Sequence, residues 1–422
     1  MIPTYSPTIT AMPTIEGEDI YFMGNSAAVG FDLDDFSSPS ILAEGVITSV
    51  SAGSNYSLPV IRGFVSFSGG FIPDIDSYKG HLGIPKEYVV EGNNTLVQVF
   101  DDRNFLLLVE KSYAGVELTE GSGIIHSMFL DLDGNAWATG ANNAGQLCLG
   151  DQFNRFTPHK VTLSEKVVDI AIGAEHTLLL TETGKVFGCG WNVQGQLGLG
   201  ENVDATTEPV QISNLNPVES ISAGRQHSLI KTSDGLYVFG SNQYGQLCTE
   251  EAIGDNIYTP HFLSVDEDLV ESFTAISQSS FVLHKSGIVD ACGRNNVGQL
   301  GDGSNTDSSY SPNIGADIPG KVVHVGKGPS SHSGFFYTDG GYMFATGLNA
   351  DGQLGLGDFD NRNVPTRIDA FEQSDDVIEI ATAVSHTLSL GDHMTGTFSP
   401  TTTPVSNQFV HFIASRCCLF PC

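Results

Sequence analysis

Five histidines are the side chains of this sequence whose type and spacing most invite chemistry. They are His126, His176, His227, His332 and His386. A zinc site needs donor atoms that converge at about 2.0 to 2.1 Å from one centre. Neighbouring histidines here are at least 50 residues apart, and equivalent positions of separate repeats stand around a ring without converging. We therefore expect no metal site and predict that these side chains hydrogen-bond within or between repeats.

The other candidates for chemistry also have a structural explanation. The segment 302–307 is similar to a calcium loop but lacks the acidic spacing and terminal Glu of a dedicated site, so it indicates a turn. The chain contains no Gly-x-Ser-x-Gly elbow and no Gly-x-x-x-x-Gly-Lys-Ser/Thr phosphate loop. We therefore assign no catalytic residue and expect no cofactor.

Four of the seven cysteines fall at recurring positions. Cys148 and Cys248 stand where other copies of the motif have Gly, and Cys189 and Cys292 each precede a strand-ending Gly. The total is odd, and Met1–Thr14 has no basic start followed by an apolar run, so we see no secretory signal. We therefore expect free buried thiols in a reducing compartment and predict a cytoplasmic or nuclear location.

The elements that position these residues recur with a fixed period. Gly-Gln-Leu starts at residues 145, 195, 245, 298 and 352, in steps of 50, 50, 53 and 54 residues. A proline follows 13 to 15 residues after each of these glycines. A histidine precedes four of them, and Ser279 takes the histidine position before Gly298. Each repeat predicts four short strands, of which Val167–Ile172 is one. Because a four-stranded sheet buries both faces only against neighbours, the pattern favours an all-β, seven-bladed β-propeller.

The motif resembles a known repeat. The stretch Gly184–Gly200 combines an apolar strand, Gly-x-Asn, two variable residues and Gly-Gln-Leu-Gly, and His176–Leu178 precedes it. This pattern is similar to the repeat of the regulator of chromosome condensation family over residues 120 to 390, and more faintly over 17 to 85. The resemblance implies a β-propeller. The family's founding member is a nucleotide-exchange factor for a small GTPase that also docks on chromatin.

The ends of the chain complete the predicted ring. Ser51–Leu58 parallels Ser222–Leu229 with Tyr56 in the His position, and Gly80–Gly83 is a degenerate Gly-Gln-Leu-Gly, which together indicate a sixth blade. The C-terminal repeat lacks its third strand, and Gly17–Asn25 supplies one at the other end of the chain. We therefore predict that the two ends share the seventh blade and close the ring.

These patterns divide the chain into three parts. We predict a flexible segment 1–16, a propeller over 17–392, and a disordered Thr- and Pro-rich tail over 393–422. Residues 86–115 exceed the repeat period, and Thr95–Phe100 and Phe105–Val109 indicate two strands around a turn. This insertion is either an enlarged or extra blade or a protruding hairpin used for binding.

The charge balance excludes some partners. The chain has 49 acidic and 18 basic residues, a net charge of −31, which disfavours direct binding to nucleic acid and docking on chromatin. No stretch approaches about 18 consecutive apolar residues, so we expect no membrane span. Ultraviolet sensing by clustered tryptophans, another activity in the family, is disfavoured because the chain has only Trp137 and Trp191.

Specificity is expected at positions that vary between repeats. The residue after the strand-ending Gly and the residue before Gly-Gln-Leu both vary, and they include Trp191, Tyr244 and Arg294, types that are enriched in interface hot spots. The alternative is that these side chains only pack against neighbouring loops. We predict a non-catalytic scaffold that presents its loops to protein partners. The alternative, implied by the resemblance, is an exchange factor for a small GTPase.

Overall fold

The computed structural model describes most of the chain from Leu107 to Gly391. The described residues are 107–116, 125–249, 253–263, 270–369 and 377–391 except 385, preceded by 18–24, 36–45, 47–54, 56–58, 60–61, 64–69, 97–98 and 102–103. The predicted segment 1–16, the tail 393–422 and Gly80–Gly83 lie outside them. The described residues form 29 strands and contain no helix long and apolar enough to cross a membrane.

Five sheets each take four antiparallel strands in chain order. The first two contain β8 (Val109–Ala114), β9 (His126–Asp131), β10 (Ala136–Gly140) and β11 (Arg155–Lys160), then β12 (Val167–Ile172), β13 (His176–Thr181), β14 (Val186–Trp191) and β15 (Ala205–Gln211). The third contains β16 (Val218–Ala223), β17 (His227–Thr232), β18 (Gly235–Gly240) and β19 (Ile257–Leu263). The fourth and fifth contain β20 (Val270–Ile276), β21 (Ser279–His284), β22 (Val289–Gly293) and β23 (Ser308–Ile314), then β24 (Val322–Val325), β25 (Ser333–Thr338), β26 (Met343–Gly347) and β27 (Arg362–Arg367). The predicted four-stranded repeat is confirmed, and β12 has the predicted bounds.

One sheet joins the two ends of the chain. Its order is β2 (Phe36–Gly45), β1 (Glu18–Gly24), β29 (His386–Gly391) and β28 (Val377–Thr382). Ile20 pairs with Leu390 and Phe22 with Leu388, so β1 takes the third-strand position that the C-terminal repeat lacks. The predicted sharing of one sheet by strands from both ends is confirmed.

The remaining sheet has five strands. They are β3 (Ile47–Ser49), β4 (Tyr56–Ser57), β5 (Val60–Ile61), β6 (Phe64–Gly69) and β7 (Val97–Gln98), of which β7 pairs with β6. Within the predicted insertion 86–115, the last residues form β8, the first strand of the next sheet. Most of the rest lies outside the described residues, so the protruding hairpin stays a prediction.

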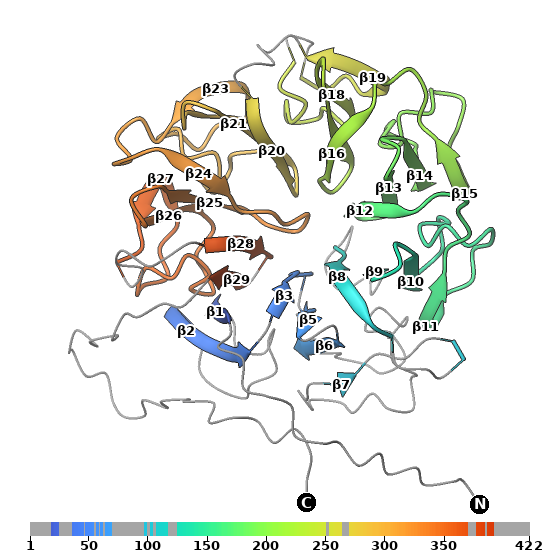
Figure 1. Ribbon diagram of the computed structural model, residues 1–422. Helices are drawn as coiled ribbons and strands as arrows, with labels where there is room; N and C mark the ends of the chain where they lie inside the picture. The colour runs from blue at the N-terminus through green and yellow to red at the C-terminus, as the bar shows by residue number, and fades with distance from the viewer. Residues whose placement is uncertain are drawn as a thin grey trace, which may run out of the picture.

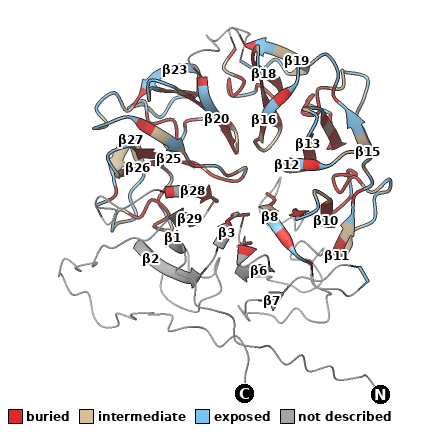
Figure 2. Cartoon of the chain, in the orientation of Figure 1, coloured by how far each residue is buried: buried red, intermediate tan, exposed pale blue. Residues whose placement is uncertain are grey.

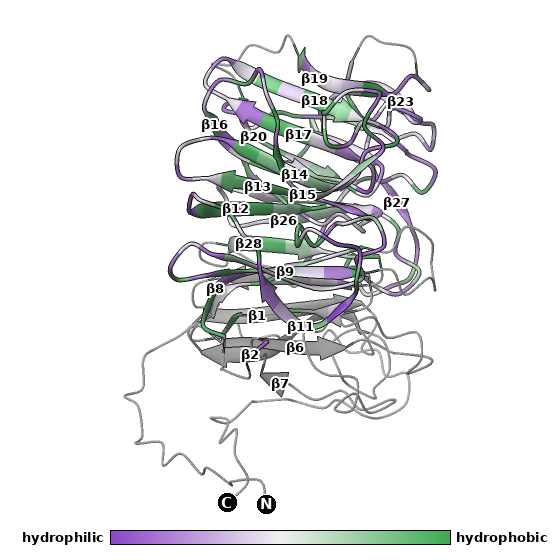
Figure 3. Cartoon of the chain, turned by 90° about the vertical axis from the view of Figure 1, so that its right-hand side faces the viewer, coloured by the Kyte–Doolittle hydropathy of each residue, from purple (hydrophilic) through white to green (hydrophobic). Residues whose placement is uncertain are grey.

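The sheets are arranged around a central axis. The first strand of each repeat, such as β12 or β16, lies nearest the axis, and the fourth, such as β15 or β19, lies at the rim (Figure 1). Every residue of β9 and β13 is buried, whereas β15 has only half-buried and exposed residues (Figure 2). Apolar residues accordingly concentrate on middle strands such as β13, and hydrophilic residues on the connecting loops (Figure 3).

The apolar cores lie between neighbouring sheets. In one of them Met128 and Leu147 of the first sheet pack with Ile170 and Leu179 of the second, and all four side chains are at most 3% exposed. Burying a side chain of this size contributes about 1.5 to 3 kcal/mol. Each sheet supplies one face to each of two cores, so each sheet is stabilised by packing against its neighbours.

A strand-ending glycine lets two loops meet. Gly190, the last residue but one of β14, has φ 100°, and a Cβ there would lie 2.3 Å from the carbonyl oxygen of Glu175. Any side chain at this position would therefore force the backbone of β14 away from the loop that precedes β13. The glycine that ends each third strand is thus required by close backbone approach.

Two disulfides correct the expectation of free thiols. Cys148 bonds to Cys189 and Cys248 to Cys292, with Cα–Cα distances of 5.4 and 5.3 Å. In each pair the first cysteine lies in the turn after Gly-Gln-Leu, with φ 59° and 53°, and the second lies on the third strand of the next sheet. The prediction was wrong because the partners belong to different repeats, whose docking brings the two positions together.

Candidate interaction face

A hydrogen-bond clasp fastens neighbouring sheets at the end where the second strands begin. His126 Nε2 lies 2.9 Å from Thr177 Oγ1 of the next sheet, and that hydroxyl donates to the carbonyl oxygen of Gln146 at 2.8 Å. Since its proton is used there, Thr177 accepts from Nε2–H, which leaves Nδ1 unprotonated. The same clasp joins His176 to Ser228 and Gln196, and His227 to Ser280 and Gln246. The predicted bonding of these histidines between repeats is confirmed.

The clasp histidines are neutral. Burial lowers the pKa of His126, His176, His227 and His386 to about 3. A proton on Nδ1 would place a charge in the dry interior with no acceptor among the described residues for the three histidines of the clasp. Among the described residues, no group of three or more His, Cys, Asp or Glu side chains could hold a metal ion.

The histidine position is filled by other residues in three sheets. Tyr56 occupies it as predicted and its hydroxyl lies 2.8 Å from Ser127 Oγ of the next sheet. Ser279 also occupies it as predicted, pairing with Gly293, but its hydroxyl donates to the carbonyl of Arg294 in its own sheet. Correspondingly, the acceptor position of the next sheet is Gly334, which has no hydroxyl.

His332 does not stand where the repeat pattern places it. Ser333 pairs with the strand-ending Gly347, so Ser333 has the clasp position and His332 precedes it. The predicted equivalence of five histidines is therefore wrong by one residue here. The cause is the longer loop between β24 and β25, residues 326–332, which shifts the register of the His-Ser pair.

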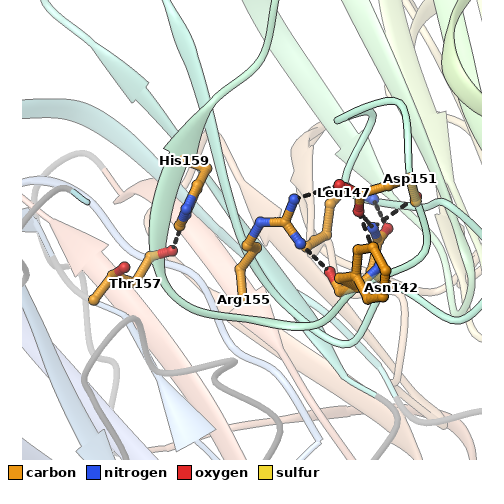
Figure 4. A network of polar contacts seen from close by, with 7 residues as sticks. Asn142, Leu147, Asp151, Arg155, Thr157 and His159 are labelled. Carbon is orange, nitrogen blue, oxygen red and sulfur yellow. Dashed lines mark hydrogen bonds and ion pairs between the residues drawn. The ribbon is translucent and has the colours of Figure 1, made fainter.

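The Gly-Gln-Leu turns are held by a second network. In the first sheet Asn142 Oδ1 accepts from the backbone N–H of Leu147 at 2.9 Å, and its Nδ2 donates to the carbonyl of Asp151 at 2.9 Å (Figure 4). Arg155 holds the carboxylate of Asp151 at 2.6 Å and lowers its pKa. Asn349, Asp358 and Arg362 repeat the arrangement. The Asn, Gln and His of the repeat thus have structural roles.

The same end of the sheets carries pairs of residues that vary between repeats. The residue after each strand-ending Gly donates its backbone N–H, at 2.7 to 3.0 Å, to the carbonyl of the residue before the clasp position. These variable pairs are Ile125/Ala141, Glu175/Trp191, Gln226/Ser241, Gln278/Arg294 and His332/Leu348. We call the surface formed by these pairs and the Gly-Gln-Leu turns the loop face. On the loop face, the turns recur from repeat to repeat, whereas the side chains of the pairs differ.

The predicted binding residues all lie on the loop face and are half-buried. The guanidinium of Arg294 lies 5.2 Å from the centre of the Tyr244 ring, and its Nη1 donates to Gln278 Oε1 at 2.7 Å. The structure therefore brings Tyr244 and Arg294 together, although they follow strands of neighbouring sheets. Trp191 belongs to the sheet before that of Tyr244.

Sequence reasoning found one member of each variable pair and missed the other. Glu175, beside Trp191, is 5% exposed, and burial raises its pKa to about 7, so this carboxyl is partly protonated at neutral pH. Gln278 and His332 were also missed. The signal was available, because the residue before each His-Ser or His-Thr pair varies as much as the residue after the strand-ending Gly.

Comparisons with known proteins agree with this architecture. A family model described as the regulator of chromosome condensation (RCC1) repeat matches residues 133–180, 183–230 and 340–390, and a second model with the same description matches 167–196 and 218–246. The ultraviolet-B receptor UVR8 of Arabidopsis thaliana is 29% identical over 63% of this chain and 61% of its own length. Human protein RCC2 is 43% identical over 32% of this chain and 27% of its own. The chain thus matches less than two thirds of either relative.

A solved structure extends the likeness to nearly the whole chain. Prp20p of Saccharomyces cerevisiae, described with its binding properties to Gsp1p and histones, aligns with a TM-score of 0.72. The alignment covers 90% of this chain and 93% of that one at 21% identity, which supports the fold alone. The chain therefore carries RCC1-type repeats, and its fold is that of a β-propeller.

Proposed function

We propose that the protein is a non-catalytic interaction scaffold, a closed seven-bladed ring that presents its loop face to protein partners. Ring closure is supported by β1, which pairs with β29 on one side and β2 on the other and so joins both ends of the chain in one sheet. Seven sheets arranged around one axis support the blade number. Closure would leave no sheet without a neighbour on either side.

The loop face carries the proposal. Its frame is fastened by the clasp and the turn network, whose Asn, Gln and His side chains are buried. The residues left to differ between repeats, among them Trp191, Tyr244 and Arg294, are half-buried on that frame. Aromatic side chains have few rotatable bonds and lose little conformational entropy on binding, and Trp, Tyr and Arg are all common interface anchors. A surface built this way suits recognition of a folded partner.

Partner capture tests the scaffold. We expect Trp191→Ala and Arg294→Ala each to weaken at least one interaction seen with the wild-type protein by about tenfold or more, as hot-spot truncations do. The matched control is Leu132→Ala, since Leu132 is 65% exposed in the turn between β9 and β10, at the end of the sheet away from the loop face. Equal binding by the wild-type protein and both loop-face variants would contradict the proposal.

Exchange activity on a small GTPase is the alternative. It is favoured by the likeness to Prp20p, which is described as binding Gsp1p, but at 21% identity that likeness concerns the fold. Release of a fluorescent guanine nucleotide from a panel of small GTPases separates the two functions. We expect no acceleration by this protein, and accelerated release would replace the scaffold by an exchange factor.

A cytoplasmic or nuclear location stays a prediction, and the two disulfides bear on it directly. Disulfides persist in oxidising compartments and are rare where thiols are kept reduced. Blocking thiols at the moment of cell lysis and counting the labelled cysteines decides the question. Labels on Cys148, Cys189, Cys248 and Cys292 would support a reducing compartment, and protection of all four an oxidising one.

A further inference from the structure

Two arginines and a histidine from three consecutive sheets lie at the end of the sheets that carries the loop face. Arg225, in the loop between β16 and β17, donates its backbone N–H to the carbonyl of Ser277 at 2.6 Å. The hydroxyl of Ser277 lies 3.5 Å from His332 Nε2. Arg294 is bonded to Gln278, the residue that follows Ser277. Burial, followed by the positive charges of Arg294 and Arg225, lowers the pKa of His332 to about 4.

The fold does not require positive charge at these positions. The residue equivalent to Arg225 is Ala174 in the preceding sheet and Ser277 in the next, and the residues equivalent to Arg294 include Ala141, Ser241 and Leu348. Arg294 makes no ion pair within the described part of the chain, and Gln278 is its one hydrogen-bond acceptor there. A guanidinium has five N–H donors, so most of the donors of Arg294 have no acceptor among the described residues.

The surroundings shape what this cluster can bind. With 49 acidic and 18 basic residues, the chain as a whole repels anions, and a long polyanion such as RNA would meet that repulsion along its length. A short acidic segment engages only the cluster. Planar guanidiniums match carboxylates with two parallel hydrogen bonds, and the Tyr244 ring under Arg294 holds the guanidinium plane in place.

We propose that Arg225 and Arg294, with His332 between them and Tyr244 beneath Arg294, form a binding site for an Asp- and Glu-rich segment of a partner protein. The inference rests on the proposed scaffold function and names the chemistry of one partner. His332, neutral at pH 7, donates or accepts one hydrogen bond, and the two arginines carry the charge.

Fluorescence anisotropy with a labelled ten-residue polyglutamate peptide at low salt tests the site. We expect Arg294→Gln and Arg225→Gln each to weaken binding about tenfold, the loss typical of one charge-assisted contact, and the double variant to abolish it. Arg294→Lys keeps the charge but not the paired hydrogen bonds, so we expect an intermediate loss.

The control removes the same charge elsewhere. Lys285 is exposed and follows β21, six residues from the loop face, which places it about 20 Å away. We expect Lys285→Gln to change affinity less than twofold. No binding by the wild-type protein, or an equal loss in Lys285→Gln, would overturn the proposal. Thermal melting of each variant verifies that it folds.

Two further measurements separate other occupants. Competition by inorganic phosphate or by a single-stranded oligonucleotide at least as strong as by free glutamate peptide would make the cluster a phosphate site and overturn the assignment. Dimerisation of the wild-type protein in sedimentation, lost in Arg294→Gln, would make a second copy of this chain the occupant. If the peptide does not bind while Trp191→Ala still weakens partner capture, the proposed scaffold function is kept and only the acidic-segment site is rejected.

Discussion

Two consecutive joints between sheets are fastened in different ways. The clasped joint, between the β16–β19 and β20–β23 sheets, has the His227–Ser280 clasp and the Cys248–Cys292 disulfide. The unclasped joint, between the β20–β23 and β24–β27 sheets, has neither, because Ser279 and Gly334 stand at the clasp positions. It is held by apolar packing, including an edge contact of Phe281 and Phe336 with ring centres 5.6 Å apart, and by hydrogen bonds such as the one from Thr346 Oγ1 to the carbonyl of Gly298 at 2.8 Å.

The difference coincides with the cationic cluster. The unclasped joint adjoins the longer loop 326–332, which carries His332 out of the clasp register and towards the two arginines. A groove of about 410 Å³, lined by Pro312, Ile314, Phe344 and Pro365 among others, opens at the outer end of the same joint. The joint that lacks the clasp and the disulfide is thus also the one that carries the cationic cluster and the groove. This is expected where residues that bind a partner replace residues that stabilise the fold.

Acidification should produce the largest difference in stability between the two joints. The clasp histidines have a folded-state pKa of about 3 against about 6.5 when unfolded, so between these values the unfolded chain binds more protons. Their stabilisation is complete above pH 6.5 and is lost as the pH falls towards 3. At pH 5 each costs about 2 kcal/mol, so we expect unfolding near pH 4 to 5.

Hydrogen exchange at decreasing pH measures this loss sheet by sheet. We expect β13 and β17, which begin with clasp histidines, to lose protection before β25, because His332 next to β25 has a higher folded-state pKa, about 4, and its protonation therefore costs less. Constant stability from pH 7 to 4.5 by urea denaturation would show that the histidines do not resist protonation as their burial requires.

Removing the disulfide of the clasped joint should have the next largest effect. Cys248→Ser with Cys292→Ser opens a loop of 44 residues, which lowers the free energy of unfolding by about 4 kcal/mol in the chain-entropy treatment. The measurement is urea denaturation under oxidising conditions. Reductant should destabilise the wild-type protein further than the variant, which keeps only the Cys148–Cys189 bond. No difference between variant and wild type would mean that the thiols are free.

A single clasp can be removed where no disulfide supports it. His176 is fully buried and bonded to Ser228 across a joint without cysteines, so His176→Ala should lower the free energy of unfolding by about 3 kcal/mol. Ser279→Ala, the matched change at the unclasped joint, removes one bond within a sheet and should cost about 1 kcal/mol. Equal losses in chemical denaturation would remove the distinction between the joints.

The repeat made much of this fold readable in advance. Gly-Gln-Leu, the prolines and the His-Ser pairs located the strands, and the missing third strand of the last repeat identified β1 as its replacement. Contacts between repeats were harder to predict from the sequence. The disulfides had a signal, since Cys248 and Cys292 occupy the same positions as Cys148 and Cys189, but which repeats touch follows from docking.

The site was readable only in part. Arg294 and Tyr244 were identified by type and variability, yet their contact joins different sheets. The shift of His332 was hidden because His-Ser occurs at both the true and the displaced position. Only strand pairing shows that Ser333, opposite Gly347, has the structural role. Local motifs therefore predict the frame, while register and neighbour geometry determine which side chains remain for binding.

Building a clasp at the unclasped joint is the subtlest test. A Cβ at Gly334 would lie 3.0 Å from Phe281 Cζ and 3.2 Å from the carbonyl oxygen of Gln299, the acceptor that a serine hydroxyl needs there. Gly334→Ser alone should therefore destabilise through crowding, and Ser279→His alone should lose the bond to Arg294. Together they recreate the His-Ser-Gln arrangement, so a double-mutant cycle should give a favourable coupling of about 1 kcal/mol. Additive effects would mean that a clasp needs more than its three groups, namely the relative position of sheets that the His-bearing repeats impose.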